Sequence, residues 1–385
     1  MNTSDNWRGR IALMVAHCAG MVDLVALPVW VGTLIAHYKL DPQQAGLLAT
    51  LFLAGAVLAS LVLAPRFNRL NGRVVAAVGF GVSALCFAGL STTSSFAAMA
   101  ALHALAGLSA GAALSVTHGT IARSAQPHRL FAIVGIALGV FAIVFLGATP
   151  PLVAAAGGAM LFKVFGGVMA VGALVALLAF PTPDALSMNS ADVAARQLGR
   201  ITPAVWFGVV GLSCMALVQA MTFSFLERVG DHRGFETSAI TGVLIALGFV
   251  NLFPALLAAV LEKRWAAQRV LLVGPVVQAL LVVVIMTSTT FMPYAAAAAV
   301  FAAVMIFTHT FAFGLLAKLD STGRAMAATP AMLMTGAAIG PILGGTLVKS
   351  LGYGSIGVVA LCIAVVAVAC FWRVQPAPVA SGVAA

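Results

Sequence analysis

The polar side chains that could do chemistry are few in this sequence, and each of them interrupts a long run of apolar residues. Asp23 is the acid that lies deepest in such a run, and Gln219, His309, His103 and Asn251 are amide and imidazole groups placed in the same way. A carboxylate can take up and release a proton, whereas amides and imidazoles form hydrogen bonds with small molecules. Each group also has a simpler interpretation, which is a hydrogen bond between neighbouring helices without a functional role.

The composition of the chain indicates the environment of these groups. Of the 385 residues, 62% are hydrophobic and only 8% are charged, whereas soluble domains are about 45–50% apolar and about 25% charged. A soluble enzyme, a disordered chain and a secreted disulfide-rich domain are therefore excluded, and an integral membrane protein is predicted. The sequence has no metal-ligand spacing and no cofactor motif, so we expect neither a metal nor a cofactor.

Apolar segments of the length needed to cross a bilayer, about 20 residues, recur along the whole chain. Segments such as Leu271–Met286 are apolar on every side, which favours helices over the alternating strands of a β-barrel. We therefore predict an all-α membrane protein with twelve transmembrane helices. The predicted spans are residues 11–36, 44–64, 74–90, 96–121, 130–156, 159–180, 203–227, 237–261, 269–288, 294–319, 326–348 and 355–372.

The positions of Lys and Arg between the spans predict the orientation of the chain. With the N-terminus in the cytoplasm, fifteen basic residues fall on the cytoplasmic side and five on the far side, which is the bias of inner-membrane proteins. Both termini are then cytoplasmic. Because the net charge of +10 is explained by topology, nucleic-acid binding is not expected, and the lipid bilayer is the expected partner. The five far-side residues are Lys39, Lys163, Arg228, Arg233 and Lys349.

A hydrophilic segment at residues 181–202 divides the chain into halves of six spans each, at residues 1–180 and 203–385. Its Pro, Ser, Asn, Asp and Arg residues are typical of a linker. A shift of about 195 residues places Arg69 on Arg264 and brings Asp23 within one position of Gln219. The sequence therefore predicts two pseudo-symmetric six-helix bundles related by an internal repeat.

Three short segments carry a resemblance to a known family. Arg66, Arg69, Gly72 and Arg73 follow the second span and resemble the signature Gly-x-Leu-Ala-Asp-Arg-x-Gly-Arg-Arg, with Pro65 at the acidic position. Asp23, followed by Leu27-Pro28, is similar to a segment of twelve-helix drug/proton antiporters. The third segment matches the pattern Gly-x-x-x-Gly-Pro-x-x-Gly-Gly and contains Gly336, Gly340, Pro341 and Gly344. The chain thus resembles a major facilitator superfamily transporter over nearly its whole length.

The resemblance implies a central cavity lined by the first, fourth, seventh and tenth spans. Asp23, His103, Gln219 and His309 each come from one of these spans, and Asn251 comes from the eighth. Trp30 shares a helix face with Asp23 and would add an aromatic wall. Asp23 is then the expected proton-coupling residue, and the other five are the expected substrate contacts. Glycine pairs four residues apart indicate close helix packing, and a role in movement is expected only where they line the boundary between the halves.

These observations predict a secondary transporter, in which the halves alternately open a site to each side of the membrane. Because Lys and Arg are missing at depth, a neutral or cationic amphipathic small molecule is favoured over an organic anion. The leading hypothesis is proton-coupled export by a monomer. The alternative is uptake of a small nutrient or weak organic acid by proton symport. An intramembrane enzyme is a remote alternative, because no catalytic motif is present.

Overall fold

The computed structural model describes residues 6–63, 66, 69–124, 126–181, 202–262, 264–319 and 329–374. Within these ranges the chain forms helices and no strand. The linker predicted at 181–202 lies almost wholly outside the described residues. The helices are α1 (Trp7–Gly20), α2 (Val22–Tyr38), α3 (Pro42–Leu63), α4 (Gly72–Leu90), α5 (Phe96–Ala122), α6 (Pro127–Ala156), α7 (Ala159–Ala179), α9 (Pro203–His232), α10 (Thr237–Val250), α11 (Pro254–Leu261), α12 (Ala267–Thr287), α13 (Phe291–Leu319), α15 (Thr329–Leu351) and α16 (Gly354–Trp372).

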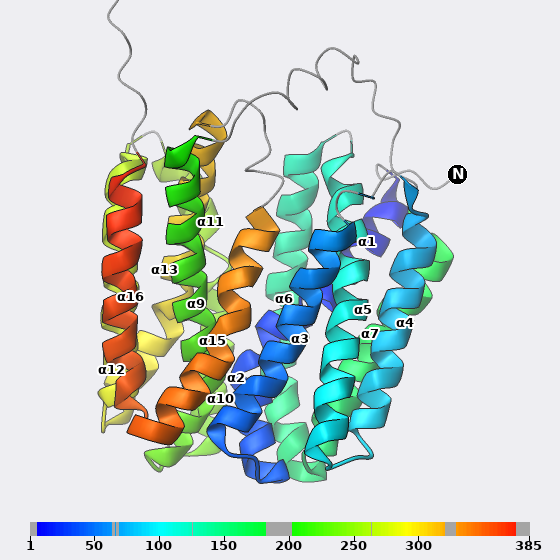
Figure 1. Cartoon of the computed structure of the whole chain (residues 1–385), viewed down its shortest axis with the longest axis horizontal. Coiled ribbons are helices and arrows are strands. Elements are labelled where there is room, and N and C mark those ends of the chain that lie inside the picture. Colours follow the sequence, from blue (N-terminus) through cyan, green and yellow to red (C-terminus); the bar gives the residue numbers. More distant parts are fainter. Residues whose placement is uncertain are drawn as a thin grey trace, which may run out of the picture.

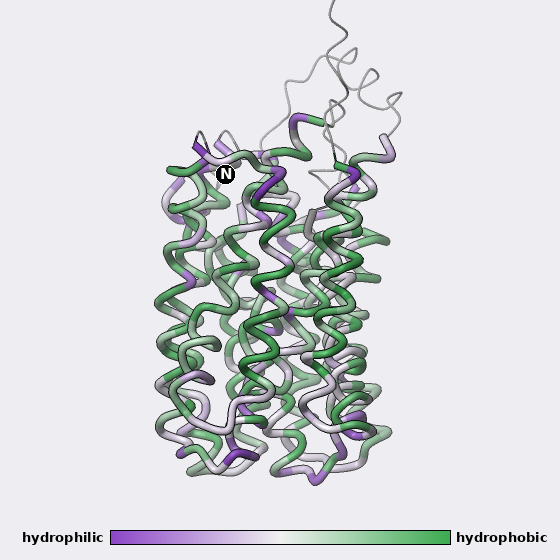
Figure 2. Tube along the Cα trace, turned by 90° about the vertical axis from the view of Figure 1, so that its left-hand side faces the viewer, coloured by the Kyte–Doolittle hydropathy of each residue, from purple (hydrophilic) through white to green (hydrophobic). Residues whose placement is uncertain are grey.

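These helices make twelve candidate membrane spans, which confirms the predicted number and the predicted fold class. In Figure 1 the helices from α1 to α7 form one bundle and those from α9 to α16 form a second bundle beside it. Figure 2 shows apolar residues along the lengths of the helices and polar residues mainly at their two ends. A backbone surrounded by lipid must satisfy its hydrogen bonds within each segment, which is why such runs fold as helices.

Two spans that the sequence predicts as single helices are each interrupted. The first span breaks at Met21, whose φ of −107° and ψ of 9° depart from helical values, between α1 and α2. The eighth span breaks between Val250 and Pro254, which separates α10 from α11. Pro254 has no backbone N–H to donate to the carbonyl of Val250, and its ring crowds that carbonyl, which accounts for the second break.

The two ends of the bundle differ in charge. We call the end where α1 begins the basic end. Of the fifteen basic residues that the sequence analysis assigned to the cytoplasmic side, eleven lie within the described ranges, and all eleven flank helix termini at this end. Arg196, Arg200, Lys263 and Arg324 lie outside the described residues. The opposite end, which we call the far end, has turns in which Lys39, Gly157, Gly234 and Gly352 adopt positive φ.

In the described part of the chain, the halves meet mainly through three pairs of helices, α2 with α9, α3 with α15 and α6 with α10. The α3–α15 pair lies at the centre of Figure 1. By contrast, α1 and α11 have their main contacts within their own halves. These two helices are the segments of the interrupted spans nearest the basic end. The α3–α15 pair is therefore the main junction between the halves, and of the two interrupted spans it is the far-end parts, α2 and α10, that add to it.

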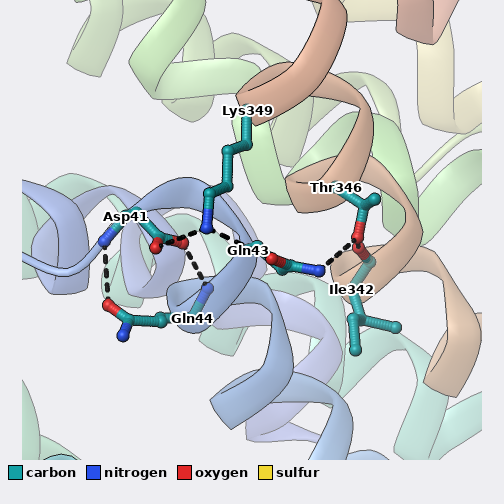
Figure 3. Close-up of polar contacts among 6 residues, drawn as sticks. All are labelled: Asp41, Gln43, Gln44, Ile342, Thr346 and Lys349. Atoms are coloured by element: carbon teal, nitrogen blue, oxygen red, sulfur yellow. Dashed lines mark hydrogen bonds and ion pairs between the residues drawn. The ribbon is translucent and has the colours of Figure 1, made fainter.

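A close approach of backbones and a set of polar contacts hold α3 against α15 near the far end. A Cβ atom on Gly46 would clash with the carbonyl oxygen of Pro341, and one on Gly345 would clash with that of Pro42. Figure 3 shows the polar contacts, in which the Lys349 ammonium lies 2.9 Å from the Asp41 carboxylate and the Gln43 amide donates to Thr346. We call the group Asp41, Gln43, Thr346 and Lys349 the far-end latch.

Candidate proton and substrate site

Asp23 lies in the first turn of α2, immediately after the break in the first span. Its side chain is 1% exposed, its Oδ1 accepts a hydrogen bond of 2.8 Å from the backbone N–H of Leu24, and its Oδ2 is buried without a partner in the described part of the chain. Leu27 and Trp30 share its face of α2, and both are buried. An acid buried within a membrane span is costly, and such groups mark ion or substrate pathways.

Trp30 and His103 lie together in the interior of the N-terminal half. Their rings stack with centroids 5.5 Å apart, and Phe52 of α3 and Phe165 of α7 pack against the indole. Both residues are 0% exposed, and the Nδ1–H of His103 donates to the carbonyl of Met99. The structure thus brings Trp30 and His103, two of the predicted site residues, into contact with each other within the N-terminal half.

Gln219 of α9 forms a pair with Gln278 of α12. The Nε2 of Gln278 donates to Oε1 of Gln219 and to the carbonyl of Met215, at 3.2 Å in both cases. Sequence reasoning assigned Gln278 no role, although it is the amide at the centre of the largely apolar ninth span. Because the contact fixes the Gln219 amide, Gln278 belongs to the candidate site as its supporting residue.

His309 and Asn251 each keep a buried polar atom without a partner in the described structure. For His309 on α13 this atom is Nδ1, and the ring packs against Phe313 with centroids 5.0 Å apart. For Asn251 it is Oδ1, and the residue caps α10 at the break in the eighth span. The adjacent Leu252 approaches Gly139 of α6 in the other half. Asn251 is therefore positioned at a helix break that contacts the opposite half.

Two further groups, which the sequence analysis did not single out, form buried contacts. Glu227 lies inside α9, because this helix continues to His232. Its Oε2 is buried without a partner among the described residues and would lie 2.9 Å from a Cβ on Gly32 of α2. His17 of α1 and His118 of α5 are paired, with Nδ1 of His17 and Nε2 of His118 3.0 Å apart. No sequence signal shows either contact, since both depend on how the helices are rotated.

The motif residues divide into a surface loop and a helix interface. Arg66 and Arg69 are exposed between α3 and α4, and Arg73 donates to the carbonyl of Phe180 at the end of the sixth span. Gly72, which starts α4, lies against the ring of Phe180. A Cβ on Gly336 would clash with the carbonyl of Ser213 of α9, and Cβ atoms on Gly340 and Gly344 would also crowd α9. These three glycines therefore pack helices within the C-terminal half, and Pro341 next to them contacts Gly46 across the halves.

No group of three or more His, Cys, Asp or Glu side chains in the described ranges is arranged to hold a metal ion. The candidate site is instead a set of isolated polar groups in an apolar bundle. The family model described as Major Facilitator Superfamily matches residues 12–322, which is most of the chain. The chain belongs to the Major Facilitator Superfamily. It is therefore a multi-pass membrane protein of a family of transporters.

Solved structures of superfamily transporters share this fold at low sequence identity. The chain matches the D-xylose–proton symporter with a TM-score of 0.76 and 14% identity, covering 96% of this chain and 98% of that one. It matches the nucleoside transporter NupG with a TM-score of 0.71 and 15% identity, covering 96% and 98%. A bacterial homologue of the human lysosomal transporter Spinster, in an inward-facing and unoccupied conformation, matches with a TM-score of 0.67 and 14% identity, covering 96% and 95%. No curated protein matches the sequence.

Proposed function

We propose that this superfamily member exports a small neutral or cationic amphipathic molecule across the inner membrane, in exchange for protons carried by Asp23. The buried Oδ2 of Asp23, which lacks a partner in the described structure, is the observation that carries the proposal. Its position beside the break at Met21 supports the role, because a helix break allows small rotations that change the access of a carboxyl group.

The nature of the cargo follows from the charges that line the spans. In the described helices, Lys and Arg lie within the first or last five residues, so none can grip an anion at mid-membrane depth. Gln219 and His309 supply hydrogen-bonding groups, and Phe313 supplies an aromatic surface next to His309. We propose these residues as direct cargo contacts, with Trp30 and His103 as an aromatic support for Asp23 and with Asn251 as a polar group at the contact between halves.

The described conformation is proposed to be inward-facing. Placing the basic end and both termini in the cytoplasm follows the positive-inside rule, and the far-end latch then closes the side of the protein away from the cytoplasm. The packing of α2, but not of α1, against the other half supports this assignment. Alternating access would require the latch to open when the halves rock about the site.

The test of proton coupling is an Asp23→Asn variant in proteoliposomes, with a cargo first identified by ligand-induced thermal stabilisation. The amide keeps the shape of the side chain but carries no titratable proton. We expect loss of transport driven by a pH gradient, by at least tenfold, while cargo exchange without a gradient continues. Retained gradient-driven transport would show that Asp23 is not the proton carrier, and Glu236→Gln serves as a control that changes an exposed carboxylate outside the spans.

Uptake by proton symport is the second candidate, because one matching structure is a D-xylose–proton symporter. Flux in everted and right-side-out membrane vesicles separates the two directions. An exporter accumulates cargo in everted vesicles when their interior is acidified, whereas a symporter accumulates it in right-side-out vesicles with an acidic exterior. The loss of coupling in Asp23→Asn is expected in either case, so the direction and the coupling residue are tested separately.

A further inference from the structure

The C-terminal half contains a groove of about 670 Å³ on its outer surface, near the basic end. Phe253 and Leu257 line one wall, Val273 and Val277 of α12 line the other, and residues 300–308 of α13 form the floor. The walls are exposed, with Phe253 64% and Val273 57% accessible. Leu257 and Trp265 are exposed as well, so the groove is open along its length.

The groove exists because α13 lacks the glycines that close the corresponding surface of the N-terminal half. There, Gly107 and Gly111 of α5 approach the backbone of Phe52 and Ala56 of α3 so closely that Cβ atoms would clash. The repeat shift of 195 residues places Ala302 and Ile306 at the two glycine positions and Asn251 at the position of Ala56. Side chains at these positions, together with the helix break at Asn251, keep the eighth span away from α13.

The basic end of the groove carries charge as well as an apolar surface. Arg264 and Arg269 line it, and Trp265 between them is 52% exposed and packs edge-on against Phe307 at 5.9 Å. The described lining holds no acidic side chain. The carboxylate of the nearby Glu262 lies toward Gly314 of α13 instead. Arginines form paired hydrogen bonds with phosphate, and tryptophan favours the membrane–water interface.

The depth of the groove matches one leaflet of a bilayer. Arg269 and Val277 are eight residues apart on α12, which is about 12 Å at 1.5 Å per residue. A single leaflet contributes about 15 Å of hydrocarbon. A ligand that fills this space therefore has an anionic head at the two arginines and an acyl chain that lies along α13.

We propose that the groove between α11, α12 and α13 binds an anionic phospholipid, with the phosphate at Arg264 and Arg269. A lipid there packs against the broken eighth span and stabilises the C-terminal half. This site is separate from Asp23, Gln219 and His309, so it does not depend on the direction of transport or on the coupling ion.

The test uses the purified full-length protein in detergent, with phosphatidylglycerol added and with phosphatidylcholine as the uncharged comparison. Native mass spectrometry counts retained lipid, and the thermal unfolding midpoint reports stabilisation. We expect selective retention of phosphatidylglycerol and a raised midpoint. The Arg264→Gln/Arg269→Gln variant should weaken retention by about fivefold for each arginine, which corresponds to about 1 kcal/mol per basic residue. Arg66→Gln/Arg69→Gln removes two exposed arginines from the repeat-related loop of the other half and should retain lipid normally.

The apolar part of the site is tested by Ala303→Trp, which fills the floor, and by Val273→Trp, which narrows the exposed wall. Either variant should lower lipid retention while both arginines remain, so a folding defect in one leaves the other informative. Equal retention of phosphatidylcholine, normal retention by the Arg264→Gln/Arg269→Gln variant, or the same stabilisation by inorganic phosphate alone would each overturn the proposal.

Discussion

The two halves share a six-helix plan but fill their interiors differently. In the N-terminal half, the ring of Trp30 packs against Phe52, Phe87, His103 and Phe165, with centroids 5.0–6.5 Å apart, in one continuous aromatic cluster. In the C-terminal half the aromatic rings form separate pairs and small groups, and the core near the basic end is largely aliphatic and methionine-rich. The same plan therefore supports a tightly interlocked half and a more adaptable one.

We propose that the two halves have different physical tasks. In the N-terminal half, the aromatic and glycine-packed bundle would keep the carboxyl group of Asp23 in a fixed place. The C-terminal half combines the Gln219–Gln278 pair, His309 and flexible methionines with a broken eighth span and an open groove. Methionine adapts to ligands of different shape. Proton binding and cargo binding would thus be divided between a rigid half and an adaptable half.

The largest expected effect is the loss of stability when a ring is removed from the aromatic cluster around Trp30. Trp30→Ala removes a fully buried indole with four ring partners, and we expect a loss of about 3–5 kcal/mol of stability. Phe301→Ala removes an equally buried ring of the C-terminal half that pairs with Phe223. Phe301→Ala should reduce the stability less, because it removes one aromatic pair whereas Trp30→Ala removes four, and each pair contributes about 0.5–1.5 kcal/mol beyond its buried area. Denaturant unfolding of the two variants in detergent measures the difference, and equal losses would contradict the contrast between the halves.

The next largest effect on stability is expected at the closely packed glycine pairs. Gly107→Ala places a Cβ against the carbonyl of Phe52, so it should destabilise the protein by about 1–3 kcal/mol. Gly135→Ala alters an equivalent Gly-x-x-x-Gly position on α6 where nothing lies within 4 Å. That variant should be neutral or stabilising by up to about 1 kcal/mol, because alanine favours the helix. Thermal unfolding midpoints distinguish these outcomes, and similar destabilisation by both substitutions would show that the N-terminal half is not held by close backbone packing.

Hydropathy predicted the spans well, because lipid forces each apolar run into a helix. The spans agree with the sequence-based boundaries to within a few residues, except at three ends. The first span begins nearer the N-terminus, at Trp7, and the seventh ends later, at His232. The eleventh candidate span runs from Met332 to Leu351, whereas its predicted start at residue 326 lies outside the described residues. The breaks at Met21 and after Val250 were not predicted. Pro254 offered a signal for the second break. At Met21 the sequence offers only the preceding glycine.

The candidate site was predicted by residue type but not by contact. A helix that is apolar all round carries no period that shows which face turns inward. The stacking of Trp30 on His103, the pairing of Gln219 with Gln278 and the burial of Glu227 against Gly32 therefore required the structure. Gly46, which joins the halves, was missed for the same reason. Gly345, the last glycine of the predicted motif, also packs across the halves, whereas Gly336, Gly340 and Gly344 pack within one half.

The smallest expected effect is at the far-end latch, where the rigid and the adaptable half are joined. Partial burial of the Asp41 carboxyl group by itself raises its pKa. Hydrogen bonds from the backbone N–H of Gln44 and from the Lys349 ammonium outweigh this effect, so the pKa of Asp41 lies below its ordinary value. The contact therefore favours the closed far end above the ordinary Asp pKa of about 3.9 and loses its effect as the pH falls below it. The two side chains are 34% and 46% exposed, so solvent screening limits the contribution to less than about 1 kcal/mol.

Lys349→Gln tests this contact by removing the charge and keeping most of the side-chain length. At pH 7 it should lower the closed-to-open ratio of the far end by no more than about fivefold, which is the equivalent of about 1 kcal/mol. Distances between spin labels at Ser94 and Thr289, exposed positions in the two halves at this end, report that ratio. At pH 3 the wild-type protein should approach the variant, because Asp41 is then increasingly protonated.

Lys163→Gln removes another far-end lysine and should leave the distances unchanged. If Lys349→Gln also leaves them unchanged at pH 7, the backbone contacts of Gly46 and Gly345 alone close this end, and the latch residues have no share in joining the halves.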